Sequence, residues 1–173
     1  MNPTRNDLPA ATRGKMTELL QERLADAIDL KLRIKNSHWN VKGPTFIALH
    51  ELFDKVAGDA EEYTDELAER SVQLGGTPDG GAATVAKGSS LPAGKKAASE
   101  SEHVQLVADA LAAFGSRVRT AIETADELND ADTADLFTEI SRGVDKWLWF
   151  VEAHVQSHAE EVVVSSRSNG RAP

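Results

Sequence analysis

The sequence predicts an all-α fold, a bundle of four long helices in which a long crossover joins the second helix to the third. Two observations support this prediction. Apolar residues recur at helical spacing in four segments, and residues 77–101, which are rich in Gly, Ala, Ser and Lys, separate the middle two. A connection of this length is unusual inside a compact domain, but in a bundle it allows the helices that it joins to run parallel. We expect it to contain a short helix.

The four helices are expected at residues 12–41, 44–74, 102–128 and 133–163, where apolar side chains recur every three or four residues. These helices would form one domain at residues 12–164. The polar residues 1–11 and 165–173 are expected to be flexible tails.

Local signals mark the expected helix ends. Gly43-Pro44 separates the first two helices, and Gly75-Gly76 ends the second. Ser99 and Glu102 have the spacing of a capping box for the third helix, and Asp132 is expected to cap the fourth.

Composition excludes several classes of site. The chain has no cysteine, so disulfides, iron–sulfur clusters and thiolate zinc sites are ruled out. Its net charge of −9 argues against a nucleic-acid-binding protein with a wholly basic surface, and is compatible with a protein that attracts cations. Nothing resembles a signal peptide or a membrane span, so we expect a soluble protein of the cytoplasm with no membrane partner.

Candidate metal ligands lie along one face of the second helix. His50 and Asp54 are four residues apart and share that face, as do Asp65 and Glu69. Asp54 and Asp65 are eleven residues apart, which brings the helix back to nearly the same azimuth. The two pairs cannot bind one metal within a single chain, because eleven residues span about 16 Å of helix.

These four positions are symmetric about the midpoint between Asp59 and Ala60. A second copy placed antiparallel across a two-fold axis would bring His50 and Asp54 of one chain to Asp65 and Glu69 of the other, which gives two equivalent sites. The small residues Gly58 and Ala60 would let the two helices approach.

His38 joins this set because it lies six residues before Pro44, and His50 lies six residues after it. In an antiparallel hairpin the two imidazoles would therefore be at the same level. Imidazoles with carboxylates suit Fe(II) and other first-row divalent ions. Structural ion pairs use the same spacing, however, so the acidic face could instead be a solvated surface of a plain helical interaction module.

The residues around these positions resemble the Dps family, the DNA-binding proteins from starved cells. The resemblance spans nearly the whole chain apart from its tails. It is carried by NSHWNVKGP at 36–44, FIALHELFD at 46–54, DELAER at 65–70, LGG at 74–76, DTADLF at 132–137 and DKWLWFVE at 145–152. The His–Trp–Asn block, with a second histidine twelve residues after the first, is the most specific. The resemblance implies a ferritin-like four-helix bundle.

The resemblance also implies a function. Dps proteins form hollow shells of twelve subunits that oxidise Fe(II), preferably with hydrogen peroxide rather than dioxygen, store ferric mineral inside and protect DNA from oxidative damage. Up to two irons would bind at each site between antiparallel subunits. The implied ligands are His38, His50 and Asp54 of one subunit and Asp65 and Glu69 of its partner, with Glu62 expected to guide the second iron.

Other residues have two interpretations. Trp39 is either a quencher of stray oxidising equivalents or a core residue. By resemblance, an acidic cluster lines the pores through which iron enters, although acids at a helix start also act as caps; we expect both roles for Asp132 and Asp135. The cluster consists of Asp126, Asp130, Asp132 and Asp135.

Two further His-containing patterns are interpreted as structural. His154 and His158 are four residues apart and could bind a metal, but they extend the apolar seam of the last helix. Glu100 and His103 have the spacing of di-iron bundle ligands, which we attribute to chance.

DNA binding is the alternative activity, in which a nucleoid-binding structural protein condenses DNA and oxidises little iron. The N-terminal region offers Arg5, Arg13 and Lys15, against Asp7. The C-terminal tail adds Arg167 and Arg171. Twelve copies of such tails could together hold DNA through its phosphates.

Overall fold

The computed structural model describes residues 1–168, with side chains described through residue 156. In this part of the chain there are five helices and no strand: α1 (Ala10–Asn40), α2 (Phe46–Gln73), α3 (Ala82–Gly88), α4 (Glu100–Glu127) and α5 (Ala131–Ser168). The predicted all-α bundle is confirmed, and α3 is the short helix expected in the crossover. Residues 169–173 of the expected C-terminal tail, including Arg171, and the side chains of His158 and Arg167 lie outside the described residues.

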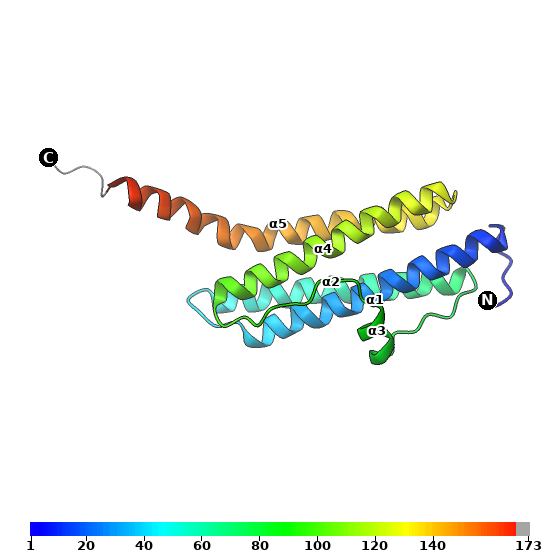
Figure 1. Ribbon diagram of the computed structural model, residues 1–173, viewed down its shortest axis with the longest axis horizontal. Helices are drawn as coiled ribbons and strands as arrows, with labels where there is room; N and C mark the ends of the chain where they lie inside the picture. Colours follow the sequence, from blue (N-terminus) through cyan, green and yellow to red (C-terminus); the bar gives the residue numbers. More distant parts are fainter. Residues whose placement is uncertain (169–173) are drawn as a thin grey trace.

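The four long helices form two antiparallel hairpins, α1 with α2 and α4 with α5 (Figure 1). The crossover, which contains α3, leads back along the bundle from the end of α2 to the start of α4, so α2 and α4 run in the same direction. Near its C-terminal end, α5 extends beyond the other helices (Figure 1). None of the described helices combines the length and the apolarity that a membrane span requires.

The bundle is held together by the apolar stripes that predicted its helices. Leu20 of α1, Phe53 of α2, Phe114 of α4 and Phe137 of α5 are fully buried in one continuous core. Each such side chain contributes about 2 kcal/mol by leaving water. A three- or four-residue spacing was therefore enough to predict these helices, because only residues at that spacing face the same core.

The helix ends confirm one predicted cap and correct another. At the start of α4, the Glu102 backbone N–H donates to Ser99 Oγ and the Ser99 N–H donates back to Glu102, which is the predicted capping box. At the start of α5 the cap is Asp130, not Asp132. The Asp130 carboxylate accepts from the Thr133 N–H at 3.1 Å and from the Thr133 hydroxyl at 2.6 Å.

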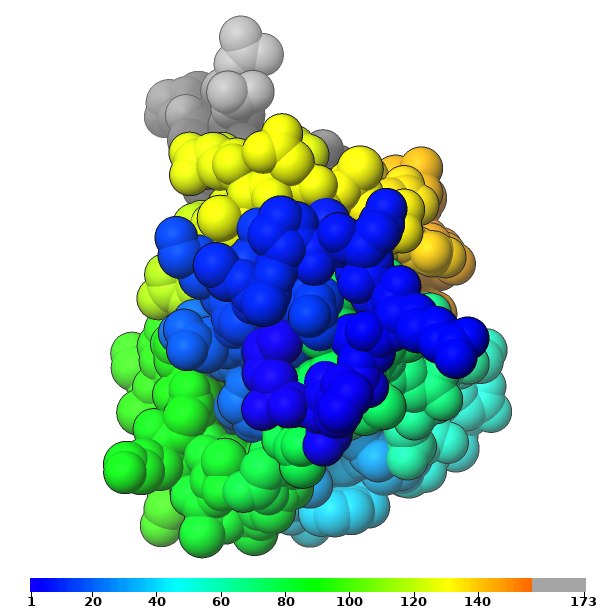
Figure 2. Space-filling model, turned by 90° about the vertical axis from the view of Figure 1, so that its right-hand side faces the viewer, coloured from blue at the N-terminus to red at the C-terminus, as the bar shows by residue number. Residues whose placement is uncertain are grey.

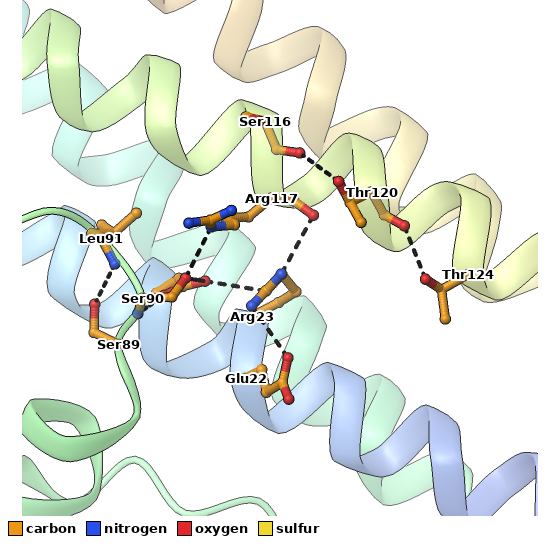
Figure 3. A network of polar contacts seen from close by, with 10 residues as sticks. Glu22, Arg23, Ser89, Ser90, Leu91, Ser116, Arg117, Thr120 and Thr124 are labelled. Carbon is orange, nitrogen blue, oxygen red and sulfur yellow. Dashed lines mark hydrogen bonds and ion pairs between the residues drawn. The ribbon is translucent and has the colours of Figure 1, made fainter.

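A polar network attaches the crossover to α1 and α4 (Figure 3). The fully buried carboxylate of Asp26 accepts from the Ser90 backbone N–H at 2.6 Å. Arg23 Nε lies 3.1 Å from the same carboxylate, close enough for an ion pair, although its N–H does not point at the oxygen. Arg117 Nε donates to Ser90 Oγ at 3.2 Å. These contacts fix the position of the segment that leads into α4.

The N-terminal segment lies across the end of the bundle that Figure 2 faces, close to the α4–α5 turn. The Asn2 backbone N–H donates to the Gly75 carbonyl at 2.7 Å, and Leu8 packs against the core. Arg13 also attaches this segment to the end of α2, because its guanidinium donates to the Leu8 and Leu74 carbonyls. α1 begins at Ala10, two residues before the expected Thr12.

Candidate metal centre

His38 of α1 and His50 of α2 form the centre of the candidate site. Their rings stack with centroids 3.8 Å apart, at the same level of the hairpin, as their equal distances from the turn predict. The His38 Nδ1–H donates to the His50 carbonyl at 2.8 Å, and the His50 Nδ1–H donates to the His38 carbonyl at 3.0 Å. A carbonyl can only accept, so both rings carry their proton on Nδ1. In the neutral form of each ring, Nε2 then has its lone pair available for a metal.

Asp54 lies one turn beyond His50 and is exposed. Its carboxylate accepts from Lys35 Nζ at 2.6 Å. The hydrogen bond and charge of Lys35 lower the pKa of Asp54, with smaller contributions from His38 and His50, so the carboxylate is ionised at neutral pH. Sequence reasoning missed Lys35. The signal was present, because Lys35 lies three residues before His38 and hence one turn along α1.

The remaining predicted ligands, Asp65 and Glu69, are exposed on the C-terminal half of α2, as is Glu62. Among the described side chains, no group of three or more His, Asp or Glu residues of this one chain is arranged to hold a metal ion. The length of α2 is the reason, because it keeps His50 and Glu69 on opposite sides of the helix midpoint. The structure thus brings the two histidines together, and leaves the second carboxylate pair apart.

The exposed face of α2 also carries apolar residues with the same symmetry. Ile47 is 62% exposed and Val72 is 58% exposed, and like the ligand pairs they are centred between Asp59 and Ala60. Gly58 faces open space, since a Cβ there would meet nothing within 4 Å. Ala60, however, is buried in the bundle core, so only Gly58 could let a second helix approach.

Trp39 is 64% exposed and follows His38 at the end of α1. The core interpretation of this residue is therefore wrong for the single chain. Trp147 of α5 is instead largely buried, and its indole N–H donates to Asp59 Oδ2 at 2.6 Å.

The acidic cluster at the α4–α5 corner divides into two kinds of residue. The side chain of Asp130 is 2% exposed and forms an ion pair with Arg70 at 2.8 Å, so its charge is neutralised within the chain. The expected pore role of Asp130 is therefore corrected to helix cap and ion-pair partner. Asp126, Asp132 and Asp135 remain exposed, and the side chain of Asp132 is 87% exposed.

A second acidic group lies between α2 and α5, which the sequence reasoning did not single out. Burial raises the pKa of Glu66, and the nearby carboxylates of Glu139, Glu62 and Asp65 raise it further. Their signal in the sequence was weak, because Glu66 and Glu139 are on different helices.

Three residues of the two weaker histidine patterns, Glu100, His103 and His154, make contacts within the chain, whereas the side chain of His158 lies outside the described residues. Glu100 accepts from the Thr45 N–H at 3.1 Å and supports the α1–α2 loop. His103 is buried, with Nδ1 3.4 Å from Ser37 Oγ. His154 is half-buried, and its Nδ1–H donates to the Phe150 carbonyl within α5.

Comparison with known proteins places this geometry in a family. The model of the ferritin-like domain matches residues 17–159. A protein from Agrobacterium fabrum named "DNA protection during starvation protein" is 42% identical over 154 residues, which cover 88% of this chain and 95% of that protein. The chain belongs to the Dps family of ferritin-like proteins.

Solved Dps structures have the same fold. The Dps protein from Bacillus brevis superposes with a TM-score of 0.79 at 31% identity, over 84% of this chain and 97% of that one. Dps from Mycobacterium smegmatis gives a TM-score of 0.84 at 30% identity, over 89% and 88% of the two chains. The part of the chain that matches the ferritin-like domain, residues 17–159, contains both His38 and His50.

Proposed function

We propose that this Dps-family chain oxidises Fe(II) at sites shared by two antiparallel copies and stores the ferric product inside a shell of twelve. The observation that supports this proposal most strongly is the shared symmetry of α2. The ligand pairs His50/Asp54 and Asp65/Glu69, and the exposed apolar pair Ile47/Val72, have one common midpoint. An isologous two-fold contact at that midpoint would pair all three at once.

Each site would then contain His38, His50 and Asp54 from one copy, and Asp65 and Glu69 from the other. The Nε2 atoms bind Fe(II), while the carboxylates stabilise the higher charge of Fe(III). Up to two irons would occupy the site as substrate, with Glu62 guiding the second. Two Fe(II) ions give one electron each to hydrogen peroxide, which takes up two protons and leaves as two waters. Dioxygen is the alternative oxidant.

Iron would reach the inside of the shell through pores lined by Asp126, Asp132 and Asp135, which remain exposed in the single chain. Trp39 is exposed next to His38, where it could take up oxidising equivalents that escape the site. We place this chemistry in the bacterial cytoplasm, where removal of Fe(II) and peroxide protects DNA.

The first test compares Glu69→Gln with Glu123→Gln, which removes the same charge from an exposed position on α4. Fe(II) and peroxide are mixed, and the ferric absorbance is followed in the near ultraviolet. We expect the initial rate of Glu69→Gln to fall by about tenfold or more, because a ligand is lost. The rate of Glu123→Gln should not change. Equal rates in both variants would exclude Glu69 as a ligand.

A mixing experiment tests whether the site is shared. His50→Ala and Glu69→Ala are each inactive if both residues are ligands, but a dimer with one chain of each kind has one intact site. Reassembly of equal amounts should restore about a quarter of the wild-type rate, because half of the dimers are mixed and one of their two sites is intact. No recovery would mean that the ligands do not come from different copies.

The oligomeric mass distinguishes the shell from a plain helical interaction module. Twelve copies of the 18.6-kDa chain would give about 220 kDa by light scattering after size exclusion. A monomer would contradict both the shared site and the shell.

DNA binding is a second candidate, favoured by the name of the Agrobacterium fabrum relative. The N-terminal region offers less free charge than the sequence suggested, because Arg13 is bound to two backbone carbonyls. Arg5 and Lys15 remain exposed. A gel shift with duplex DNA at low ionic strength tests this candidate; no retained DNA would rule it out, since phosphate contacts are strongest there.

A further inference from the structure

A hollow of about 480 Å³ lies between the end of α1, the α1–α2 loop, the second half of the crossover and the start of α4. We name it the basic hollow. Its polar lining comes from separate parts of the chain: Asn36 and Asn40 of α1, Lys42 of the loop, Lys95 and Lys96 of the crossover and His103 of α4. It contains none of the proposed iron ligands.

The charge of the basic hollow is opposite to that of the chain as a whole. Three lysines line it and no carboxylate does, although the chain carries a net charge of −9. Among the described residues, none of these lysines is in an ion pair. The neighbouring Glu102 is committed elsewhere, because it accepts from the Ala98 and Ser99 N–H groups at 2.7 and 2.9 Å.

Neutral donors complete the lining. The amide of Asn40 donates to the Asn36 carbonyl and to Asn36 Oδ1, so the Asn36 side chain uses its acceptor there and keeps its NH₂ group as a donor. Burial lowers the pKa of His103, so this ring is neutral near pH 7. His103 Nδ1 lies 3.4 Å from Ser37 Oγ, and either atom can be the donor.

Ammonium groups together with amide N–H donors, with no carboxylate in the lining, are suited to an oxyanion. From this donor set, which four separate parts of the chain bring to one hollow, we infer that the basic hollow binds a phosphate group, supplied either by inorganic phosphate or by the backbone of DNA. A metal cation is disfavoured there by the three positive charges. The site is independent of the proposed iron chemistry.

The test uses Lys95→Gln/Lys96→Gln in the assembled protein. The matched control is Lys87→Gln/Lys146→Gln, which removes two exposed lysines that do not line the hollow. Inorganic phosphate is titrated into each protein by calorimetry at low ionic strength. We expect binding by the wild type and the control, and at least about tenfold weaker binding by the Lys95/Lys96 variant. No binding by the wild type, or equal losses in both variants, would overturn the inference.

A second variant separates the pocket from general surface charge. Asn36→Asp keeps the shape of the side chain and all three lysines, but puts a carboxylate in the hollow, so phosphate binding should again fall. Unchanged affinity in this variant would overturn the inference, since a repelling charge inside the site must weaken an anion.

A gel shift with short duplex DNA identifies the source of the phosphate. If the DNA backbone occupies the hollow, the Lys95/Lys96 variant should retain less DNA than the control does. If DNA retention is equal while phosphate binding is lost, the ligand is free phosphate. Each of these two results supports the site. If the Lys95/Lys96 variant loses neither phosphate binding nor DNA retention, the inference is contradicted.

Discussion

Asp130 is predicted to be a determinant of stability. Asp130→Ala removes the cap of α5, which costs about 1 kcal/mol. It also removes the close partner of Arg70, whose side chain is 12% exposed, and leaves only the Asp132 carboxylate at 3.9 Å, at a cost of about 2 kcal/mol. We therefore expect Asp130→Ala to lower the free energy of unfolding by about 3 kcal/mol. For a chain of this size, that corresponds to roughly 6–12 °C in Tm.

The assay is urea unfolding followed by circular dichroism at one fixed subunit concentration, because assembly changes the apparent stability. Asp130→Asn keeps the cap and loses the charge, so it should have an intermediate effect. Asp132→Ala removes an exposed charge and should change stability by less than about 0.5 kcal/mol. Equal midpoints for Asp130→Ala and Asp132→Ala would refute this reasoning.

Two further predictions concern pH and metal binding. Burial first, and then the charges of Asp59 and nearby glutamates, raise the pKa of Tyr63 far above its ordinary value near 10. The unfolded chain releases this proton near pH 10 and the folded chain keeps it, so stability should be lost as the pH rises above 10. Because Tyr63 is the only tyrosine, phenolate absorbance should appear only as helical dichroism is lost, and phenolate in a fully helical protein would contradict this account. Lys35→Ala frees the Asp54 carboxylate, so it should tighten Zn(II) binding a few-fold in calorimetry. The control Lys31→Ala removes an ion pair to Glu61 and should leave the Zn(II) affinity unchanged. Equal Zn(II) affinities of the two variants would exclude competition by Lys35.

Much of the fold could be predicted because its signals are local. The capping box at Ser99 and the apolar stripe through Phe53 depend on residues only a few positions apart. The misassigned cap shows the limit. Asp130 and Asp132 are equivalent as short patterns. Arg70, which lies 2.8 Å from Asp130 but 3.9 Å from Asp132, is sixty residues before Asp130 in the sequence.

The candidate site was partly predictable for a related reason. His38 and His50 flank one turn at equal distances, so counting residues was enough to place them together. Lys35, which contacts Asp54, and the exposure of Trp39 depend on how two helices face each other and on what covers them. The spacing of residues along one helix does not determine either property. The pairing of Asp65 and Glu69 with the histidines depends on a second copy and stays a prediction.

The paired hydrogen bonds between His38 and His50 have a consequence for the energetics of metal capture. Each imidazole is anchored to the backbone of the opposite helix, so a slide of one residue, about 1.5 Å, would break both bonds together. The rings are consequently held rigidly before any ion arrives, and little rotamer entropy is left to lose on binding. The hairpin therefore works as a preorganised chelating arm, and the adjustable part of the centre is the carboxylates.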